Sequence, residues 1–362
     1  MSMGEIVLEL IPSPRNTRNS EGAFVQLNDG RLMMAYTRFG ADGGDNGTAI
    51  IAAKFSTDQG KTWSEREFGL VRNEAKMNVM SVSLLRLQDG RVAMFYLRKE
   101  GWHDTRLYMR TSSDEAQSWS PPRLCIPAPG YFVVNNDRVI QMENGRLVVP
   151  AAYHRMKGPS TSHWDDFDLR GITMFFMSDD AGETWQESDD WWGLPKPNKW
   201  GMQEPGVVQL SSGRLFAWAR TDVGFQWGMY SSNLGRNWTE PYQTPYQSPC
   251  SSLSIKRVPN SKLLLSVWND HSGKLAPVDP NAPLGWDRWP LAMSVTRSEK
   301  NPYENMKIID DDPDRGFAYT AIHFTEDDHV LLAYSAGSKE SLNQLGTLRV
   351  RRIALSAFGL SE

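Results

Sequence analysis

The sequence has little of what marks several common classes of protein. Only two of its 362 residues are cysteine, Cys125 and Cys250, and they show no CxxC spacing. A disulfide framework and a structural zinc site are therefore not indicated. The six histidines show no metal-ligand spacing, and neither an HExxH motif nor a glycine-rich phosphate loop is present. We therefore expect no metal and no cofactor.

Long apolar runs and an excess of one charge are also absent. No apolar run approaches the roughly 20 residues that span a membrane. Lysine and arginine number 39 against 43 aspartate and glutamate, a formal net charge of −4 without a basic stripe, so nucleic acid is not an expected partner. The start, MSMGEIVLEL, shows no basic region followed by an apolar stretch. No signal peptide is evident, and the compartment stays open between the cytoplasm and export with a removed signal.

What the chain does contain is a motif of the form Ser-x-Asp-x-Gly-x-Thr-Trp, repeated four times with some decay. The copies are STDQGKTW from Ser56, SSDEAQSW from Ser112, SDDAGETW from Ser178 and SSNLGRNW from Ser231. Repeats at such intervals indicate a propeller or a solenoid. Each copy is typical of a tight turn, in which the Asp accepts backbone N–H groups and the Gly supplies a positive φ. We interpret these Asp residues as turn-formers and the Trp as a plug in the apolar layer below.

A β-hairpin pattern is interleaved with this motif: an apolar alternating run, a turn such as Asp-Gly-Arg, and a second apolar run. The copies are AFVQLNDGRLMMAY from Ala23, SVSLLRLQDGRVAMFY from Ser81, RVIQMENGRLVVPAAY from Arg138, GVVQLSSGRLFAWAR from Gly206, SLSIKRVPNSKLLLSVW from Ser252 and TAIHFTEDDHVLLAYS from Thr320. Six hairpins predict an all-β, six-bladed β-propeller spanning residues 1–362 as one domain, because each unit of a repeat fold packs only on its neighbours.

Two further features complete the expected fold. The repeated motif should lie between the third and fourth strands of the first four blades. The segment GEIVLEL at 4–10 has no hairpin partner, and we expect it to join the last blade and close the ring, which would remove open sheet edges. No helix of ordinary length is predicted. The long loops at 191–201 and 275–290 are candidates to carry function.

A propeller with this motif resembles the sialidase superfamily of glycoside hydrolases, in which the motif is called the Asp box. The resemblance covers essentially the whole chain, although Asp boxes also occur in proteins that are not sialidases. It implies that Asp45, in the loop FGADGGDNGTAIIAAKFSTD, is the general acid/base, with Asp42 as the alternative. It implies that Tyr319, in GFAYTAIHF, is the nucleophile, and that Glu204, in QEPGVVQLSSGRLFAWAR, is its base.

The chemistry behind this assignment is coherent. A 2-keto sugar acid carries a carboxylate on its anomeric carbon, which repels an attacking carboxylate but not a neutral phenol. Tyrosine has a pKa near ~10 and so needs a base, which Glu204 would supply. Asp45 would protonate the leaving oxygen and then activate water, worth roughly 10²–10⁴-fold in rate.

The resemblance also assigns arginines that hold the substrate carboxylate, and here the match is incomplete. Arg220 and Arg288 fit two of the three expected positions. Where the family has Arg-Ile-Pro before the first inner strand, this chain has Ser20-Glu21-Gly22, and Glu21 would repel a carboxylate. Arg18 or Arg15 could swing in from one turn away. Arg38 is a further candidate for substrate binding.

The third hairpin offers additional polar residues at the expected channel mouth. They are Asn135, Asn136, Asp137 and Arg138 before the hairpin, and His154 and Arg155 at its end. We expect Asn136, Asp137, Arg138 and His154 to contribute to substrate binding. His103 would lie near the same rim.

These observations predict an exo-acting glycoside hydrolase that releases a terminal acidic sugar, a sialic acid or a related nonulosonic acid. Two alternatives stay open. One is a propeller enzyme that acts on another acidic sugar such as a uronic acid, as a hydrolase or as a polysaccharide lyase with His154 or Tyr319 as base. The other is a glycan-binding propeller without catalysis, whose rim aromatics would stack on sugars: Trp102, Trp164, Trp192, Trp200 and Trp227.

Overall fold

The structure, a computed structural model, describes residues 3–158, 166–279, 281–341 and 343–359, and these are built almost entirely of β-strands. Their single named helix is the short 3₁₀ helix η2 (Leu355–Phe358). None of the described helical segments is long and apolar enough to cross a membrane. The chain is therefore all-β, as its hairpin pattern predicts.

The first sheet shows how the predicted hairpins form. It contains β2 (Arg18–Gln26), β3 (Leu32–Phe39), β4 (Ala49–Ser56) and β5 (Phe68–Val71), in that order. Gly30 has φ 87° in the turn between β2 and β3, and the Leu27 N–H donates to the Arg31 carbonyl at 2.8 Å. Glycine adopts this conformation without steric cost, which explains the recurring Asp-Gly-Arg turn.

The second and third hairpins share one nine-stranded sheet. Its main path runs β14-β13-β12-β10-β8-β7-β6, with β11 paired to β12 and β9 paired to β8. Its strands are β6 (Asn78–Arg86), β7 (Val92–Gly101), β8 (Asp104–Ser112), β9 (Arg123–Leu124), β10 (Tyr131–Val133), β11 (Ile140–Gln141), β12 (Leu147–His154), β13 (Ile172–Ser178) and β14 (Gln186–Glu187). Among the described residues, the strands of the two halves pair at one place, where Tyr131 lies parallel to Thr105.

The fourth and fifth hairpins each begin a four-stranded antiparallel sheet. The strands of the first are β15 (Gln203–Gln209), β16 (Leu215–Arg220), β17 (Phe225–Ser231) and β18 (Tyr242–Gln247). Those of the second are β19 (Ser254–Arg257), β20 (Leu264–Asn269), β21 (Leu291–Thr296) and β22 (Lys307–Asp310). In both sheets the strands lie side by side in chain order.

The last sheet joins the two ends of the chain. It contains β23 (Arg315–Phe324), β24 (His329–Ser338), β25 (Leu348–Ala354) and β1 (Glu5–Leu10), with β1 as the outer strand. Strand β1 pairs antiparallel with β25, from Glu5 opposite Arg352 to Leu10 opposite Leu348. The prediction that the N-terminal strand joins the last sheet is confirmed.

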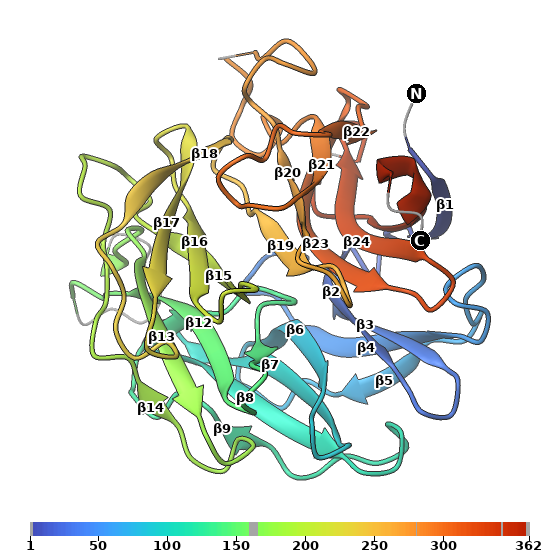
Figure 1. Cartoon of the computed structure of the whole chain (residues 1–362). Helices are drawn as coiled ribbons and strands as arrows, with labels where there is room; N and C mark the ends of the chain where they lie inside the picture. The colour runs from blue at the N-terminus through green and yellow to red at the C-terminus, as the bar shows by residue number, and fades with distance from the viewer. Residues whose placement is uncertain (1–2, 159–165, 280, 342, 360–362) are drawn as a thin grey trace.

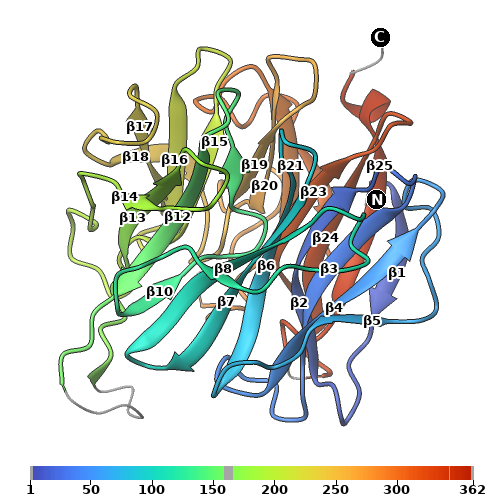
Figure 2. The ribbon, with the colours of Figure 1, turned by 90° about the horizontal axis from the view of Figure 1, so that it is seen from below.

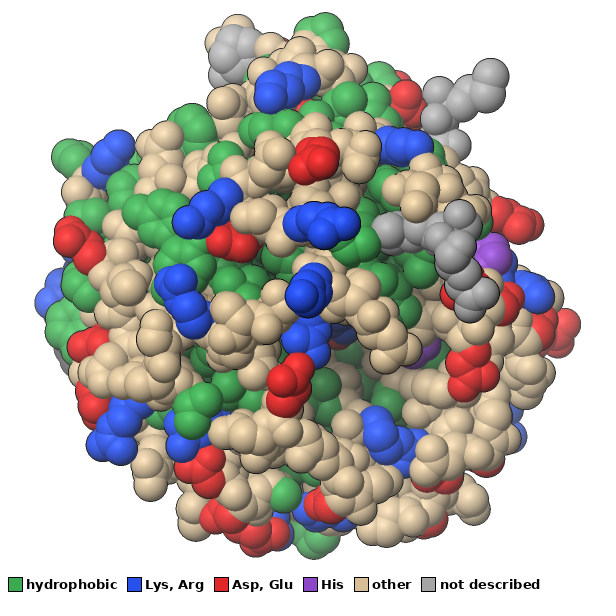
Figure 3. Space-filling view, viewed as in Figure 1, with side chains coloured by type: hydrophobic (Ala, Val, Ile, Leu, Met, Phe, Trp, Pro, Cys, Tyr) green, Lys and Arg blue, Asp and Glu red, His purple; other side chains and the backbone are tan. Residues whose placement is uncertain are grey.

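The sheets are arranged around a common centre (Figure 1), and the view from the side in Figure 2 shows loops at both ends of the strands. The first strand of each hairpin lies toward the middle, where β2 packs beside β6 and β23, and β15 beside β12 and β19. Positive and negative side chains are interspersed over the face seen in Figure 3. Neither positive nor negative side chains dominate that face.

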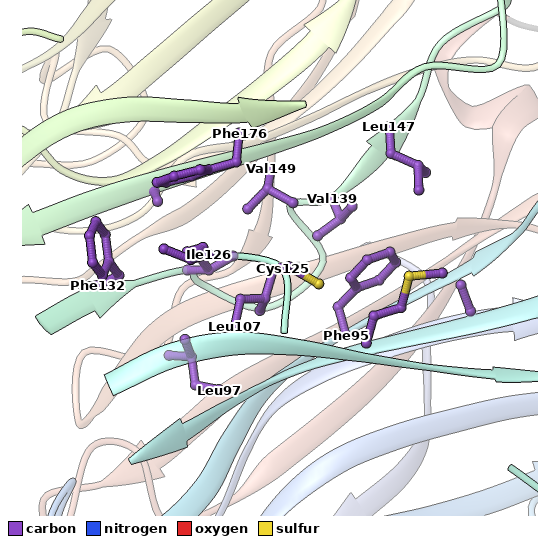
Figure 4. Packing of buried hydrophobic residues seen from close by; sticks show 14 of the residues in the cluster. Phe95, Leu97, Leu107, Cys125, Ile126, Phe132, Val139, Leu147, Val149 and Phe176 are labelled. Carbon is purple, nitrogen blue, oxygen red and sulfur yellow. The ribbon is translucent and has the colours of Figure 1, made fainter. Parts of the chain in front are cut away.

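Hydrophobic clusters fill the space between neighbouring sheets and between the two halves of the nine-stranded sheet. Figure 4 shows one of them, in which Phe176 and Val149 approach Phe95 and Leu107 from the facing strands. Another cluster joins the last sheet to the first through residues that include Phe24 and Leu331. Each sheet thus buries both faces against its neighbours, which is how a repeat fold builds a core larger than one unit could bury.

Each Asp box lies between two consecutive strands: β4 and β5, β8 and β9, β13 and β14, or β17 and β18. In the two four-stranded sheets that carry a box, these are the third and fourth strands, as predicted. In the first box, Asp58 accepts the backbone N–H of Thr62 at 2.9 Å and its hydroxyl at 2.7 Å, while Ser56 Oγ accepts the N–H of Gly60 at 2.9 Å. Asp114 and Asp180 repeat this pattern. The box Trp residues pack on the clusters between sheets, with Trp238 only 4% exposed. The Asp residues are turn-formers.

Candidate active site

A cavity of about 140 Å³ lies where the inner strands meet, and it collects residues from distant parts of the sequence. Its lining includes Glu21, Asp45, Tyr131, His154, Glu204, Arg220 and Tyr319. Apolar side chains complete the wall on the side of the nine-stranded sheet, among them Met80, Leu97, Val133 and Phe167. A concave site with a few convergent polar groups and an apolar wall is suited to a small ligand such as one sugar ring.

A repeated β-bulge places four of the lining side chains. Glu21, Ser81, Glu204 and Tyr319 have positive φ values of 59°, 58°, 45° and 61°. Each lies where the register between the first and second strands of its hairpin shifts. A bulge re-aims a side chain, and left-handed backbone is uncommon for residues other than glycine. Left-handed residues held by the surrounding structure cluster at functional sites.

Tyr319, Glu204 and Arg220 form one contact group in the cavity. The Tyr319 hydroxyl donates to Glu204 Oε1 at 3.4 Å, and Arg220 Nη1 is 3.0 Å from Glu204 Oε2. Burial and the neighbouring Glu204 carboxylate raise the pKa of Tyr319, and Arg220 and Arg288 only partly oppose them. The phenol is therefore protonated at rest and has a carboxylate in position to take its proton.

Asp45 reaches the cavity from the loop between β3 and β4. Its Oδ1 accepts a hydrogen bond from Arg18 Nη1 at 2.5 Å, and its side chain is 59% exposed. Desolvation opposes ionisation of Asp45, but Arg18 outweighs it and holds the pKa below its ordinary value. Asn78 holds this loop in place, because its Nδ2 donates to the carbonyls of Asp45 and Gly47 at 2.9 and 2.7 Å.

Glu21 is a buried carboxyl group in the wall of the cavity. Arg18 Nη2 donates to its Oε1, and the Ser81 hydroxyl donates to its Oε2 at 2.7 Å. Burial raises the pKa of Glu21 even though the charge of Arg18 lowers it. Arg18, one of the two arginines that could replace the missing first arginine, thus lies beside the cavity but pairs with two acidic side chains. Arg15 is exposed.

The sequence analysis missed Lys99 and Tyr131. Lys99 Nζ donates to the Tyr131 hydroxyl at 2.9 Å and to the Asp45 carbonyl at 3.1 Å, and burial lowers the pKa of Lys99 to about 8. A signal was available: Lys99 follows Phe95 and Leu97 at intervals of two in β7, so strand alternation places it on their buried face.

His154 lines the cavity, as expected from its place at the end of β12. Its Nδ1 lies 3.1 Å from the Asp168 carbonyl, and its ring stacks on Phe167 at 5.0 Å between centroids. Burial lowers the pKa of His154 to about 4. The imidazole is therefore neutral and a weak base near neutral pH.

The other predicted arginines lie outside the lining of the cavity. Arg288 lies behind Tyr319, with its guanidinium 5.6 Å from the ring centroid and Nη2 donating to the Cys250 carbonyl at 3.2 Å. Arg38 lies on β3 and pairs with Glu67 at 3.2 Å. Strand alternation explains the position of Arg38, because it is turned away from the face that its neighbour Phe39 buries.

The segment 136–138 makes contacts across the middle of the molecule and does not line this cavity. Asn136 Nδ2 donates to the Gly22 and Tyr319 carbonyls at 2.7 and 3.1 Å. Asp137 pairs with Lys256 at 2.7 Å and accepts the Ile322 N–H at 2.9 Å. Arg138 Nη1 donates to Ser254 Oγ at 3.1 Å. These residues tie opposite inner strands together, and Asn135 is the member of this segment that reaches the cavity.

The remaining candidates divide between the cavity and the rest of the molecule. Trp200 lines the cavity, whereas Trp102 and Trp227 are buried and Trp192 packs against a core cluster. Trp164 lies outside the described residues. His103 is exposed, and Asp42 accepts the Thr48 N–H at 3.3 Å within the loop that carries Asp45. In the described part of the chain, no group of three or more His, Cys, Asp or Glu side chains could hold a metal ion.

Comparison with solved structures shows the same fold in several proteins. A protein of unknown function from Dyadobacter fermentans is 17% identical, covers 97% of this chain and 99% of its own, and gives a TM-score of 0.71. The intramolecular trans-sialidase from Ruminococcus gnavus is 14% identical, with 98% of each chain covered and a TM-score of 0.71. A Trypanosoma rangeli sialidase is 18% identical over 95% of this chain and 56% of its own, with a TM-score of 0.69.

A comparison with curated proteins found no match. Residues 30–332, most of the chain, match the model of the BNR repeat-like domain. The match covers the second to fifth hairpins and all four Asp boxes, and it includes parts of the first and last hairpins. The chain therefore belongs to the BNR repeat-like domain family.

Proposed function

We propose that this protein is an exo-acting glycoside hydrolase that retains anomeric configuration through a tyrosine nucleophile. The observation that carries the proposal is the contact between the Tyr319 hydroxyl and Glu204 Oε1 inside the cavity, with Asp45 at its margin. Paired carboxyl and phenol groups of this kind serve covalent catalysis, because the base activates a nucleophile that is weak at its own pKa.

The proposed reaction has two steps. In the first, Tyr319 loses its proton to Glu204 and bonds to the anomeric carbon, while the glycosidic oxygen leaves with a proton from Asp45. In the second, water attacks the anomeric carbon, Asp45 takes a proton from it, and Tyr319 leaves and recovers its proton from Glu204. Tyrosine nucleophiles are a known departure from the usual pair of carboxylates in glycoside hydrolysis.

The surroundings of Tyr319 support this assignment. The cavity wall holds three acidic side chains, Glu21, Asp45 and Glu204. Their charge would destabilise a nucleophile that is itself anionic at rest. A neutral phenol avoids this repulsion until its proton moves to Glu204. Arg220 and Arg288 then lower the energy of the phenolate that forms during attack.

The lyase alternative has less support in the same site. A lyase needs a base that abstracts a proton from carbon, and His154 has its pKa lowered to about 4. So weak a base is poorly matched to that task near neutral pH. The acidic side chains of the cavity also leave little positive charge to neutralise a uronate.

We also propose that the chain forms a single six-bladed propeller domain. The nine-stranded sheet would then be two blades, whose strands pair where Tyr131 lies opposite Thr105, and each of the other four sheets would be one blade. Hydrophobic clusters between each sheet and the next, including the last and the first, support this arrangement. It places every candidate catalytic residue at an inner strand or at a loop beside one.

The test of the proposed function is hydrolysis of a panel of aryl glycosides that includes sialosides, uronides and neutral glycosides. Cleavage should release the aryl group and a reducing sugar without a new ultraviolet-absorbing double bond. Trapping with a 2-fluoro sugar of a cleaved substrate should leave one sugar on Tyr319, detected by mass spectrometry of peptides. A label on another residue, or cleavage by elimination, would refute the mechanism.

A further inference from the structure

Glu21 occupies a part of the cavity in which a negative charge is costly to bury. Its side chain is 4% exposed, and its backbone has φ 59°, a conformation that few residues other than glycine adopt. Both carboxyl oxygens accept hydrogen bonds, one from Arg18 and one from Ser81. Each oxygen keeps a second lone pair that could accept a hydrogen bond from a ligand. This wall of the cavity therefore presents acceptors.

Arg18 does not offset this property, because each of its three side-chain nitrogens already donates to a side chain of the protein. Its Nε donates to Ser20 Oγ at 2.8 Å, its Nη1 to Asp45 at 2.5 Å and its Nη2 to Glu21. The guanidinium also lies 4.2 Å from the centroid of the Phe39 ring, which fixes its plane. A substrate carboxylate would have to displace an acidic side chain to reach it.

The other two arginines leave the balance of charge unchanged. Arg220 lines the cavity, but it pairs with Glu204 and donates to Gln203 Oε1 at 3.1 and 2.6 Å. Arg288 lies behind the Tyr319 ring. Among the described residues that line the cavity, Glu21, Asp45 and Glu204 are acidic and Arg220 is basic, while Arg18 beside the cavity is already paired with Glu21 and Asp45. A substrate carboxylate would add a further negative charge next to these acidic side chains, and like-charge repulsion opposes this.

We infer that the cavity takes a terminal sugar with no carboxylate on its anomeric carbon, and that Glu21 sets this preference by accepting hydrogen bonds from sugar hydroxyls. The inference rests on the proposed hydrolase function and narrows its substrate to neutral sugars. It departs from the acidic sugar that the sequence resemblance implies. The apolar wall formed by Met80, Leu97 and Val133 would cover a C–H face of the ring.

The test is a binding measurement with a matched pair of ligands. One ligand is the methyl α-glycoside of N-acetylneuraminic acid, and the other is the same glycoside with its carboxylate reduced to a primary alcohol. Isothermal titration calorimetry in one buffer measures the affinity for each ligand. We expect the wild type to bind the alcohol about tenfold more tightly than the carboxylate, or to bind the carboxylate not at all.

Substitution of Glu21 should reverse this order. Glu21→Ala frees Arg18 Nη2, so the affinity for the carboxylate should rise about tenfold or more. Glu21→Gln keeps the size and one acceptor oxygen but removes the charge, and it should raise the affinity for the carboxylate by a smaller factor than Glu21→Ala. Glu67→Ala removes a comparable ion-paired Glu, the partner of Arg38 outside the cavity, and should change neither affinity. Thermal unfolding would verify that each variant is folded.

Two outcomes would overturn the inference. One is a wild type that prefers the carboxylate; the other is a folded Glu21→Ala or Glu21→Gln variant with no gain in affinity for it. Both readouts are independent of turnover. They therefore judge the role of Glu21 separately from the hydrolase proposal, which would fail on its own if no glycoside in the panel were cleaved.

Discussion

The Tyr319 hydroxyl donates to Glu204 Oε1 across 3.4 Å, although the two residues are 115 positions apart in the sequence. Both have positive φ, and both lie at a bulge in the first strand of a hairpin. The same local device in two repeats thus aims two different side chains at one point. This geometry, repeated by Glu21 and Ser81, brings side chains from different repeats into one cavity.

Removal of the phenolic oxygen tests the nucleophile. Tyr319→Phe should lower kcat by about 100-fold or more on any cleaved glycoside, because the covalent intermediate can no longer form. Its melting temperature should stay close to that of the wild type, since the long contact with Glu204 contributes little stability. Tyr153→Phe, which changes a tyrosine outside the cavity, is the matched control. Full activity of Tyr319→Phe would contradict the mechanism.

The role of Asp45 can be read from the leaving group. Asp45→Asn should slow the release of an alkyl alcohol by about 100-fold, but the release of dinitrophenol only slightly, because a good leaving group needs no proton. Steady-state kinetics with a series of aglycones would measure this difference. Asp42→Asn, in the same loop, should leave both rates within about threefold of the wild type. An equal loss for every leaving group would argue against acid catalysis.

The pH profile should reflect the contact between Asp45 and Arg18. The pKa of Asp45 lies below its ordinary value, so the protonated acid becomes scarcer as pH rises, and kcat/KM should fall from acidic toward neutral pH. Arg18→Met removes the cation, and the fall in kcat/KM should then occur about one pH unit higher. A fall that stays in place in a folded Arg18→Met variant would show that another group controls it.

Lys99 should make stability depend on pH in the alkaline range. Its pKa is about 8 in the folded protein against 10.5 for the unfolded chain, so the unfolded state binds more protons between these values. The free energy of unfolding should therefore rise with pH across this window, by about 1 kcal/mol between about pH 7 and pH 9. Lys99→Met should lose this increment, as measured by urea unfolding at both pH values. An unchanged slope would refute the burial argument.

The fourth Asp box offers a test of the turn chemistry. Burial opposes ionisation of Asp58 and Asp180, but their hydrogen bonds within the box, those from Thr62 and Thr184 foremost, together outweigh it and bring the pKa of each to about 2. Asn233 takes the place of Asp in the fourth box and accepts the Asn237 N–H at 2.9 Å. Asn233→Asp should therefore raise the melting temperature at neutral pH, because a carboxylate is the stronger acceptor.

The gain in Asn233→Asp should disappear in acid. A depressed folded-state pKa stabilises the protein above the unfolded value near 4, and this contribution is lost as pH falls toward about 2. Scanning calorimetry from about pH 7 to pH 2 would follow the difference between variant and wild type. A difference that persists at pH 2 would point to packing rather than charge.

Local pattern was sufficient to predict the secondary structure. Alternating apolar residues around Asp-Gly-Arg turns predict hairpins such as β2–β3 and β6–β7, because strand period and turn chemistry are properties of neighbouring residues. The Asp boxes were predictable for the same reason, since Ser56 and Asp58 bond within eight residues of chain. The pairing of β1 with β25 followed from a strand without a local partner.

The site was only partly predictable. Resemblance to a family pointed to Asp45, Glu204 and Tyr319, and the structure places all three at one cavity. It gave no indication that Arg18 would pair with Glu21 and Asp45, or that Asn136 would bond to Gly22 and Tyr319 across the middle of the molecule. The burial of Lys99 beside Tyr131 was also missed, although strand alternation indicated it.

The sequence by itself determined the hairpins, the Asp-box turns and the strand that joins the two ends of the chain. Each depends on side chains that act on nearby backbone, so their pattern is visible in short segments. Only the tertiary structure decided which charges meet in the cavity, and whether Arg18 faces a substrate or two acidic side chains. Those contacts join residues from different sheets, and their energies depend on burial and distance, which no local pattern specifies.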